Sequence, residues 1–365
     1  MRKLLFALLF AVSCARNPTP PPTTPPVDPP TNPPVETPTT PPVVHFDPMT
    51  ASLEQLARVR GAMWTAKLNL AWGPRPNQDS NVLAMVFYDL YGTEDRTRMR
   101  AAYKQRGYTH SVTGPITGND CYHGAWPCRM GIPTQEQWDA YLDSLQELWD
   151  DGIFPIYFAH PDGWTLPNNS AGMDQLDALY RQERAQKLLR IVVYSGWEPS
   201  GDKYGWNNAQ YVAWVKRGVE VFPNSLRLLH LVSDLDAPTG QDDDRVLPAG
   251  QGNVVSWRNV TPYIHGYLAQ FGGYVSGNNE VPTQKFKDDF AYAVRDYVRR
   301  FKQGYAGWPT TSAWGNQPLK FYAGEYAAYG VYWHNWDEKY SVELGNLAVA
   351  NGADGYLDGG NADVP

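Results

Sequence analysis

Short apolar runs alternate with amphipathic helical stretches over most of the chain after about residue 50. In the stretch 134–151, for example, Trp138, Leu145 and Leu148 recur at helical spacing. Apolar runs of about seven residues, each bounded by loops and followed by a helix, are typical of buried parallel strands. Eight runs fit this description: 66–72, 107–113, 153–159, 189–195, 226–232, 261–267, 319–325 and 354–360.

Helices are expected before and between these runs, at 50–60, 94–105, 134–151, 173–189, 208–222, 283–303 and 336–350. Eight strands that alternate with helices predict a closed α/β barrel of the (β/α)8, or TIM, class. Because the eighth run lies close to the end of the chain, we expect the helix at 50–60 to cover the seam of the barrel. The alternative is an open doubly wound sheet, which is disfavoured because no glycine-rich phosphate turn follows the first run.

The amino-terminal residues read as a targeting segment. Arg2 and Lys3 precede an apolar run, 4–12, that is too short to span a bilayer, and the run ends at small residues and Cys14. This pattern resembles a bacterial lipoprotein signal, which implies that Cys14 is lipidated and becomes the new amino terminus. An ordinary secretory peptide cut nearby is the alternative, and either interpretation predicts export.

A proline-rich segment separates this leader from the rest of the chain. Residues 17–42 hold 13 of the 31 prolines, a composition that cannot bury a core and favours extended polyproline conformation. The expected organisation is therefore a signal over 1–14, a Pro/Thr-rich linker over 15–45 and one barrel domain over 46–365.

The composition limits the kinds of partner that we expect the barrel domain to bind. Hydrophobic residues make up 42% of the chain and charged residues 19%, as in a globular protein with a sizeable core. The net charge of -7 argues against a nucleic-acid partner and against an anionic membrane surface, which leaves a lipid at Cys14 as the expected membrane contact. The 14 Trp and 23 Tyr either fill the core or line a groove in which flat sugar faces stack on aromatic rings.

Two cysteines besides Cys14 lie close together, Cys121 and Cys128, and in an oxidising compartment we expect them to form a local disulfide. With His123 between them they do not match a zinc spacing, so no metal site is predicted. The acidic stretch 234–244 does not have calcium-loop spacing and is interpreted as a solvated loop. No cofactor is expected.

In a (β/α)8 barrel the active site forms at the carboxyl ends of the strands. Polar and aromatic residues gather on or after the predicted strands, and a core role, bonded inside the barrel, is the alternative for each histidine among them. His230 lies within the fifth predicted strand. The residues that we assign to substrate binding are His110, His160, Asp162, Trp164, Trp197, Asp234, His265, Tyr267, Trp333 and Asp358.

Two glutamates follow apolar strands directly, Glu198 in VVYSGWEP and Glu325 in KFYAGEY. Their placement resembles the clan of retaining (β/α)8 glycoside hydrolases, whose acid/base follows strand four and whose nucleophile follows strand seven. Glu198-Pro199 matches the Glu-Pro of that clan's Asn-Glu-Pro motif, but Trp197 stands in place of the Asn. The resemblance covers roughly residues 62–360 and implies that Glu198 is the proton donor and Glu325 the nucleophile.

Three functions remain open at this point. The first is an exported or envelope-anchored glycoside hydrolase that acts on a polysaccharide. The second is a non-catalytic barrel that binds glycan, and Trp197 in place of the Asn motivates it, because barrels can lose catalysis and keep a groove. The third is a surface protein of prophage or virion origin.

Overall fold

The computed structural model describes most of the barrel domain and none of the leader or linker. The chain divides into two units, Met1–Pro42 and Val43–Pro365, and every described residue lies in the second. The described residues are 47–62, 93–105, 107–113, 132–159, 170–194, 208–234, 259–272, 283–304, 309–315, 317–324 and 338–358.

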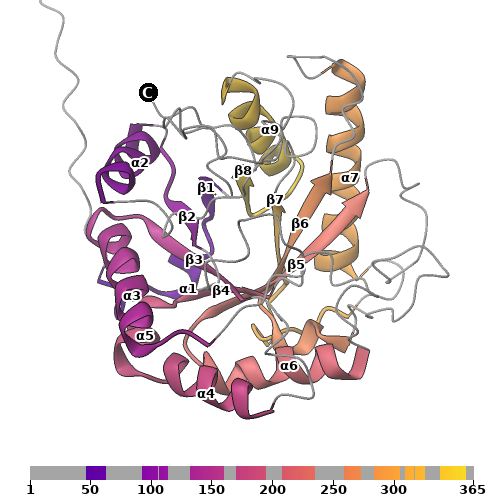
Figure 1. Ribbon diagram of the computed structural model, residues 1–365. Coiled ribbons are helices and arrows are strands. Elements are labelled where there is room, and N and C mark those ends of the chain that lie inside the picture. Colours follow the sequence, from indigo (N-terminus) through magenta and orange to yellow (C-terminus); the bar gives the residue numbers. More distant parts are fainter. Residues whose placement is uncertain are drawn as a thin grey trace, which may run out of the picture. The chain divides into compact units, whose positions relative to one another are not determined.

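Eight parallel strands close into a barrel, in which each strand pairs with its neighbours in sequence and β8 pairs with β1 (Figure 1). The chain is therefore a (β/α)8 TIM barrel, as the alternation of apolar runs predicts. The strands are β1 Arg60–Ala62, β2 His110–Thr113, β3 Phe154–Ala159, β4 Ile191–Tyr194, β5 Leu226–Asp234, β6 Gly266–Gly272, β7 Lys320–Gly324 and β8 Gly355–Asp358.

The strand registers fix the shear of the barrel. When the pairings are extended at constant register, a row that starts at Gly61 passes through all eight strands and returns to the first at the level of Leu53, eight residues earlier. A shear of eight over eight strands is the value of TIM barrels. Residues at equal height along the barrel axis are therefore found by moving one residue further on each successive strand.

Helices surround the strands and are capped by the residues that the sequence places at their ends. Thr134 forms a capping box with Gln137 at the start of α3. Thr283 caps α7, and Gly304 ends it in the left-handed conformation, with φ at 69°. The helices are α1 Leu53–Leu56, α2 Thr93–Gln105, α3 Gln135–Asp150, α4 Ser170–Tyr180, α5 Glu183–Leu188, α6 Asn208–Val221, α7 Gln284–Gln303 and α9 Glu338–Ala350.

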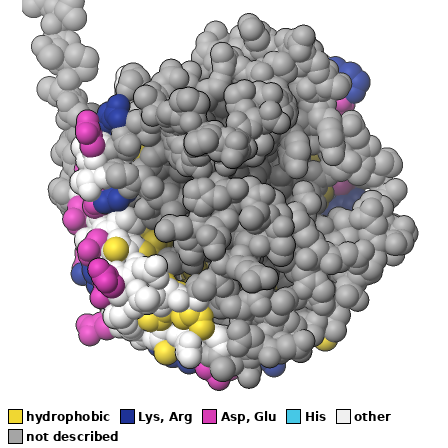
Figure 2. All heavy atoms as spheres, viewed as in Figure 1, with side chains coloured by type: hydrophobic (Ala, Val, Ile, Leu, Met, Phe, Trp, Pro, Cys, Tyr) yellow, Lys and Arg dark blue, Asp and Glu magenta, His cyan; other side chains and the backbone are white. Residues whose placement is uncertain are grey.

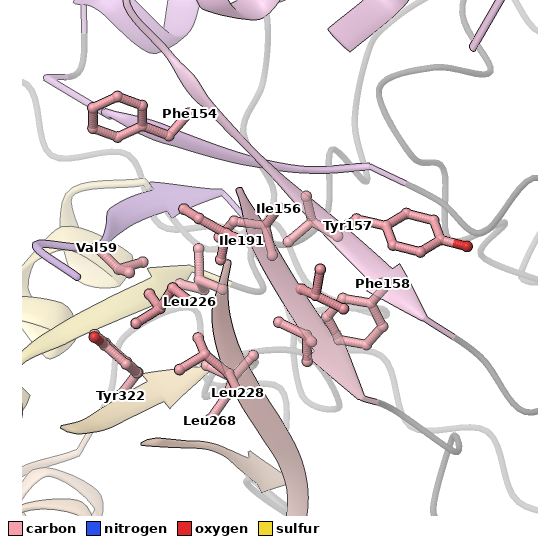
Figure 3. Packing of buried hydrophobic residues seen from close by; sticks show 14 of the residues in the cluster. Val59, Phe154, Ile156, Tyr157, Phe158, Ile191, Leu226, Leu228, Leu268 and Tyr322 are labelled. Carbon is pink, nitrogen blue, oxygen red and sulfur yellow. The ribbon is translucent and has the colours of Figure 1, made fainter. Parts of the chain in front are cut away.

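The barrel interior is a packed apolar core and not a pore. Ile156, Ile191 and Leu226 point toward one another between the strands, whereas Tyr157 points to the opposite face of β3 (Figure 3). On that outer face the Tyr157 hydroxyl bonds the Tyr180 hydroxyl of α4 at 2.6 Å. Alternation along each strand therefore separates an inner core from a second apolar layer under the helices.

Ion pairs link the helices on the outside. Arg96 and Arg100 of α2 bond Glu147 of α3 at 2.7 and 2.6 Å. Charged side chains of both signs lie along the edge that these helices occupy in Figure 2. None of the helices within the described ranges is long and apolar enough to cross a bilayer.

Three expectations about the elements need correction. The first barrel strand is β1, not 66–72, because β1 pairs with both β2 and β8; the run 66–72 lies outside the described residues. The sixth strand is β6, which begins near the end of the predicted run 261–267, because Thr261–Tyr263 forms a 3-10 turn around Pro262. The helix expected at 173–189 is two helices, α4 and α5.

The helix expected at 50–60 is also different from its prediction. It is the single turn α1, and it lies under the amino-terminal end of the barrel instead of covering the seam. Side chains of β2 and β7 reach it: His110 Nε2 bonds Leu56 O at 3.0 Å, and the Tyr322 hydroxyl donates to Ala57 O at 2.9 Å. These bonds satisfy carbonyls that a helix end leaves without partners.

Candidate active site

The mouth of the barrel is the end at which all eight parallel strands finish. At this end β4 stops at Tyr194 and β7 stops at Gly324. According to the strand registers, Tyr194, His230, Ala269 and Gly324 lie at equal height along the barrel axis. Glu198 comes four residues after the end of β4, and Glu325 directly after the end of β7. Both glutamates lie outside the described residues, and they follow strands that end at the same level.

The carboxyl end of β4 is fixed by α6. The Tyr194 ring meets Trp214 edge-on, with centroids 5.1 Å apart. Its hydroxyl lies against Gly218, where a Cβ would come within 1.7 Å of the hydroxyl oxygen. Only a glycine leaves room for this close approach. These two contacts of Tyr194 with α6 hold the strand that leads to Glu198 from the helix side.

The highest layer of the barrel interior whose side chains are described contains Phe158, His230 and Gly324, which come from alternate strands. Phe158 and His230 meet edge-on, with ring centroids 5.5 Å apart. His230 is buried, with 3% of its surface exposed. The sequence alone does not assign it to the site, although alternation in LRLLHLV places it on the same face as Leu226 and Leu228.

His110 lies at the opposite, amino-terminal end of the barrel, so its expected place in a substrate site at the mouth is corrected. It is the first residue of β2, its Nε2 is bonded to Leu56 O, and its Nδ1 lies 2.7 Å from Thr109 Oγ1. Because a carbonyl only accepts, Nε2 carries the proton. Burial lowers the pKa of His110 to about 3, so the ring is neutral and structural.

His265 and Tyr267 also lie toward the amino end, because β6 starts later than expected. His265 precedes β6 and accepts a bond from the backbone N–H of Arg227 through Nδ1, at 2.9 Å. Burial lowers its pKa to about 3, and the neighbouring Arg227 acts in the same direction. Tyr267 stacks on Phe301 of α7, and its hydroxyl bonds Thr261. Their expected place at the mouth is therefore corrected.

Asp234 and Asp358 are the last residues of β5 and β8, at the carboxyl ends where we expected them. Asp234 pairs with Gly272, and Asp358 pairs with Ala62. Only the backbone of these two residues is described, so their role in binding stays a prediction. The other assigned residues lie outside the described ranges: His160, Asp162, Trp164, Trp197, Trp333, Cys14, Cys121 and Cys128.

The described part of the chain holds no group of three or more His, Cys, Asp or Glu side chains that would bind a metal ion. Asp354, which directly precedes β8 at the amino end, is paired with Lys302 at 2.9 Å. What the structure places at the mouth is thus an imidazole, an aromatic ring and the ends of the two strands that precede the glutamates.

No family model matches this sequence, and no curated protein sequence does. Among solved structures, a protein described as a glycoside hydrolase is 14% identical over 75% of this chain, with a TM-score of 0.43, and this chain spans 59% of its length. A GH5-4 broad-specificity endoglucanase from Clostridium longisporum is 11% identical, with a TM-score of 0.42, over 84% of this chain and 87% of that one.

A β-glucosidase from Thermotoga maritima in complex with galacto-hydroximolactam is 10% identical over 83% of this chain and 85% of its own, with a TM-score of 0.44.

Proposed function

We propose that this chain is a glycoside hydrolase that cleaves a polysaccharide by a two-carboxylate mechanism, with Glu198 as proton donor and Glu325 as nucleophile. The observation that supports the proposal most is the equal height at which β4 and β7 end. Each strand is followed within four residues by a glutamate. Two carboxylates that must reach one glycosidic bond need this placement across one mouth.

The chemistry assigns a separate task to each carboxyl group. Glu198 protonates the oxygen of the leaving sugar while the Glu325 carboxylate attacks the anomeric carbon, which breaks the glycosidic bond and forms a glycosyl ester. Water then attacks the same carbon and gives its proton to Glu198, which releases the sugar and frees Glu325. A proton donor of this kind must keep its proton near neutral pH, which requires burial or a neighbouring carboxylate.

Aromatic residues near the two glutamates supply the binding surface in this proposal. Trp164 follows β3, Trp197 precedes Glu198, and Trp333 follows Glu325. Their flat rings match the apolar faces of sugar rings and would hold a polysaccharide across the mouth. The polar residues that we assign to the same surface, His160, Asp162 and Asp234 among them, would bond sugar hydroxyl groups.

Turnover tests the proposal directly. The wild-type protein and the variants Glu198→Gln, Glu325→Gln and Glu220→Gln are incubated with a panel of polysaccharides, and released reducing ends are measured. We expect the wild type to cleave at least one substrate and the first two variants to lose about a thousandfold or more in rate. Glu220 is exposed at the end of α6, so its variant serves as the matched control and should keep full activity.

The separation of the two carboxyl groups in a ligand-bound crystal structure tests the mechanism. About 5–5.5 Å indicates retention of configuration, and about 6.5–9.5 Å indicates inversion. A separation beyond about 12 Å would exclude a shared bond and contradict the two-carboxylate mechanism.

A barrel that binds glycan without cleaving it is the second candidate, because Trp197 stands where the related clan has an Asn. Binding of a polysaccharide from the panel without turnover would favour it. A wild-type protein that neither binds nor cleaves any member of the panel would contradict both functions.

We also propose that the chain is exported and anchored by a lipid at Cys14, on the support of the leader and the proline-rich linker. Mass spectrometry of the mature amino terminus tests this, and an unmodified terminus beyond Cys14 would contradict the lipid but not export. Thiol titration of the folded protein tests the Cys121–Cys128 disulfide, for which we expect no free thiols.

A further inference from the structure

A group of cations surrounds the turn 351–354, which leads from α9 into β8 at the amino-terminal end of the barrel. The helices α7 and α9 lie side by side at this flank of the barrel (Figure 1). The cations come from the second half of α7, the first residue of β7 and the first residue of β1, and each contacts the turn. We call these four residues the basic surface: Arg60, Arg295, Lys302 and Lys320.

Among the described residues that these four cations bond, one provides a carboxylate, Asp354. It pairs with Lys302 at 2.9 Å and with Lys320 at 3.5 Å. The two guanidinium groups bond uncharged oxygens instead. Arg295 donates to a side-chain amide oxygen of the turn at 2.6 Å, and Arg60 donates to the main-chain oxygen of Asp354 at 3.0 Å. Because uncharged oxygens do not cancel a positive charge, the basic surface has an excess of positive charge.

The basic surface is partly open to solvent. Arg295 is exposed, and the side chains of Lys302 and Lys320 are 24% and 29% exposed. Side chains of this kind pack their apolar stems and keep their charged ends near water. The net charge of -7 argues against an anionic membrane for the chain as a whole, but it does not describe this surface, which favours an anionic partner.

The described chain also enters the barrel at this end. The segment 47–57 lies across the amino-terminal end, where Tyr322 of β7 donates to it, and Arg60 begins β1 shortly afterwards. The residues between Cys14 and this segment would span about 100 Å if they were extended. A lipid at Cys14 would therefore keep the barrel near a membrane without fixing which face points toward it. Confinement of this kind makes a second, weak contact effective.

We propose that the basic surface docks on an anionic lipid surface and directs the mouth of the barrel away from the membrane. The inference rests on the proposed lipid anchor at Cys14 and does not depend on the proposed catalysis. Each Lys or Arg near an anionic membrane strengthens binding about fivefold. Because the parallel strands run from this end to the mouth, a barrel docked in this way presents its mouth to material outside the membrane.

Vesicle binding of the mature chain from residue 14, with Cys14→Ser so that no lipid is attached, tests the basic surface. Co-sedimentation is measured at about 0.1 M salt with vesicles that contain equal parts of phosphatidylglycerol and phosphatidylcholine, and with vesicles of phosphatidylcholine alone. We expect binding to the anionic vesicles only. The double variant Lys302→Gln, Lys320→Gln should bind about tenfold or more weakly, whereas Lys302→Arg, Lys320→Arg should bind as the parent does because it keeps both charges.

The matched control is the double variant Arg184→Gln, Lys216→Gln. It removes two charges from α5 and α6, which flank β4, the strand across the barrel from β8. This control should bind within about twofold of the parent chain, since its net charge equals that of the double lysine variant but its basic surface is intact. Urea unfolding of each variant reports separately on the fold.

Three results would overturn the inference. The first is equal binding of the parent chain and the double glutamine variant of the two lysines. The second is equal binding to vesicles with and without phosphatidylglycerol, because the contact is then not electrostatic. The third is binding of an anionic polysaccharide, such as polygalacturonate, without binding of the anionic vesicles, because the partner is then not a lipid.

The anchor and the docking fail in different ways. An unmodified mature terminus in mass spectrometry removes the anchor, and the inference is then overturned together with it. A lipid at Cys14, combined with no binding of the Cys14→Ser chain to anionic vesicles, overturns the inference alone. Turnover on polysaccharides is a separate measurement and decides neither outcome.

Discussion

The inward-facing polar groups at the two ends of the barrel have different surroundings. At the amino-terminal end, the segment 47–57 lies across the barrel, and its carbonyl oxygens accept bonds from Arg190, His110 and Tyr322. At the carboxyl-terminal end, the highest interior layer whose side chains are described contains Phe158, His230 and Gly324, and the chain continues from β4 and β7 to the two glutamates that we propose as catalytic residues. Polar side chains at the first end therefore bond main-chain carbonyls, whereas the residues that follow the strands at the second end are those that we propose act on a substrate.

Because of this difference, we expect substitutions at the two ends to affect stability and activity differently. A change at the amino-terminal end should weaken the fold and leave the rate of the folded protein unchanged, whereas a change at the mouth should do the reverse. Substitutions and a pH series at the amino-terminal end, and a substitution beside β4, test this separation.

The largest effect is expected from Arg190→Met. Arg190 is 7% exposed and donates to Pro48 O, to Ala51 O at 2.9 Å and to Asn224 O at 3.0 Å. Methionine keeps the apolar stem and leaves these carbonyls without the donor, so we expect a loss of about 3–5 kcal/mol in the free energy of unfolding, measured in urea.

The matched control for this variant is Arg184→Met on α5. Arg184 is 41% exposed and pairs with Asp143 at the surface, so its loss should cost less than about 1 kcal/mol. If Arg190→Met proved as mild as this control, the segment 47–57 would not be held by the bonds that Arg190 makes. Turnover per folded molecule should be unchanged in both variants.

An acid-dependent loss of stability is expected from the two histidines at the amino-terminal end. Their imidazoles have pKa values near 6.5 when unfolded and about 3 when folded. Between these values the unfolded state binds more protons, so the free energy of unfolding falls as the pH falls. The slope is about 1.4 kcal/mol per pH unit for each histidine, and the loss reaches about 2 kcal/mol each at pH 5.

Urea unfolding between about pH 7 and pH 5 checks this, because most carboxyl groups stay ionised in that range. His110→Gln keeps a donor for Leu56 O but cannot titrate. The free energy of unfolding of this variant should therefore fall with pH by about 1.4 kcal/mol per pH unit less than that of the wild type. A slope equal to that of the wild type would show that His110 already titrates normally in the folded protein.

The smallest effect is expected from Gly218→Ala at the carboxyl end of β4. The added Cβ would meet the Tyr194 hydroxyl, and overpacking of this kind costs about 1–3 kcal/mol. Alanine recovers up to about 1 kcal/mol through its better helix propensity in α6, which leaves a net loss of about 1 kcal/mol. Because β4 leads to Glu198, this variant should also lower kcat, unlike Arg190→Met.

Tyr194→Phe provides the control for the glycine variant. The Tyr194 hydroxyl is buried without a hydrogen-bond partner among the described residues, so its removal should not destabilise the protein. Gly218→Ala should be milder in the Tyr194→Phe background. Equal effects in both backgrounds would show that the hydroxyl contact does not position β4.

The sequence predicts this fold well where strands are apolar runs and poorly where they are not. β3, β4, β5, β7 and β8 begin within two residues of their predicted starts because each lies within one of the runs that the sequence pattern marks as a strand. β1 has the sequence Arg-Gly-Ala, which carries no strand pattern, and it is a strand because β2 and β8 pair with it. Pairing between distant segments is not visible in a local pattern.

The same limit of local patterns applies to the individual residues of the candidate site. The positions of the two glutamates after the fourth and seventh strands could be predicted, because they depend only on counting apolar runs. The positions of His110 and His265 could not, because a shift of a few residues in a strand boundary moves a side chain from one end of the barrel to the other. His230 needed the registers, which alone show that it shares a layer with Phe158 and Gly324.

The segment 47–57 has a mechanical consequence. A force applied to the chain before Asp47 would act first on the amino-terminal end of the barrel, through the bonds of Arg190 to Pro48 and Ala51. The strands that end at the mouth would bear this load only after those bonds had broken. A recombinant fragment that starts at Val59 would lack this segment and the buried side chains of Ala51, Leu56 and Ala57, which belong to the core, so we expect it to aggregate.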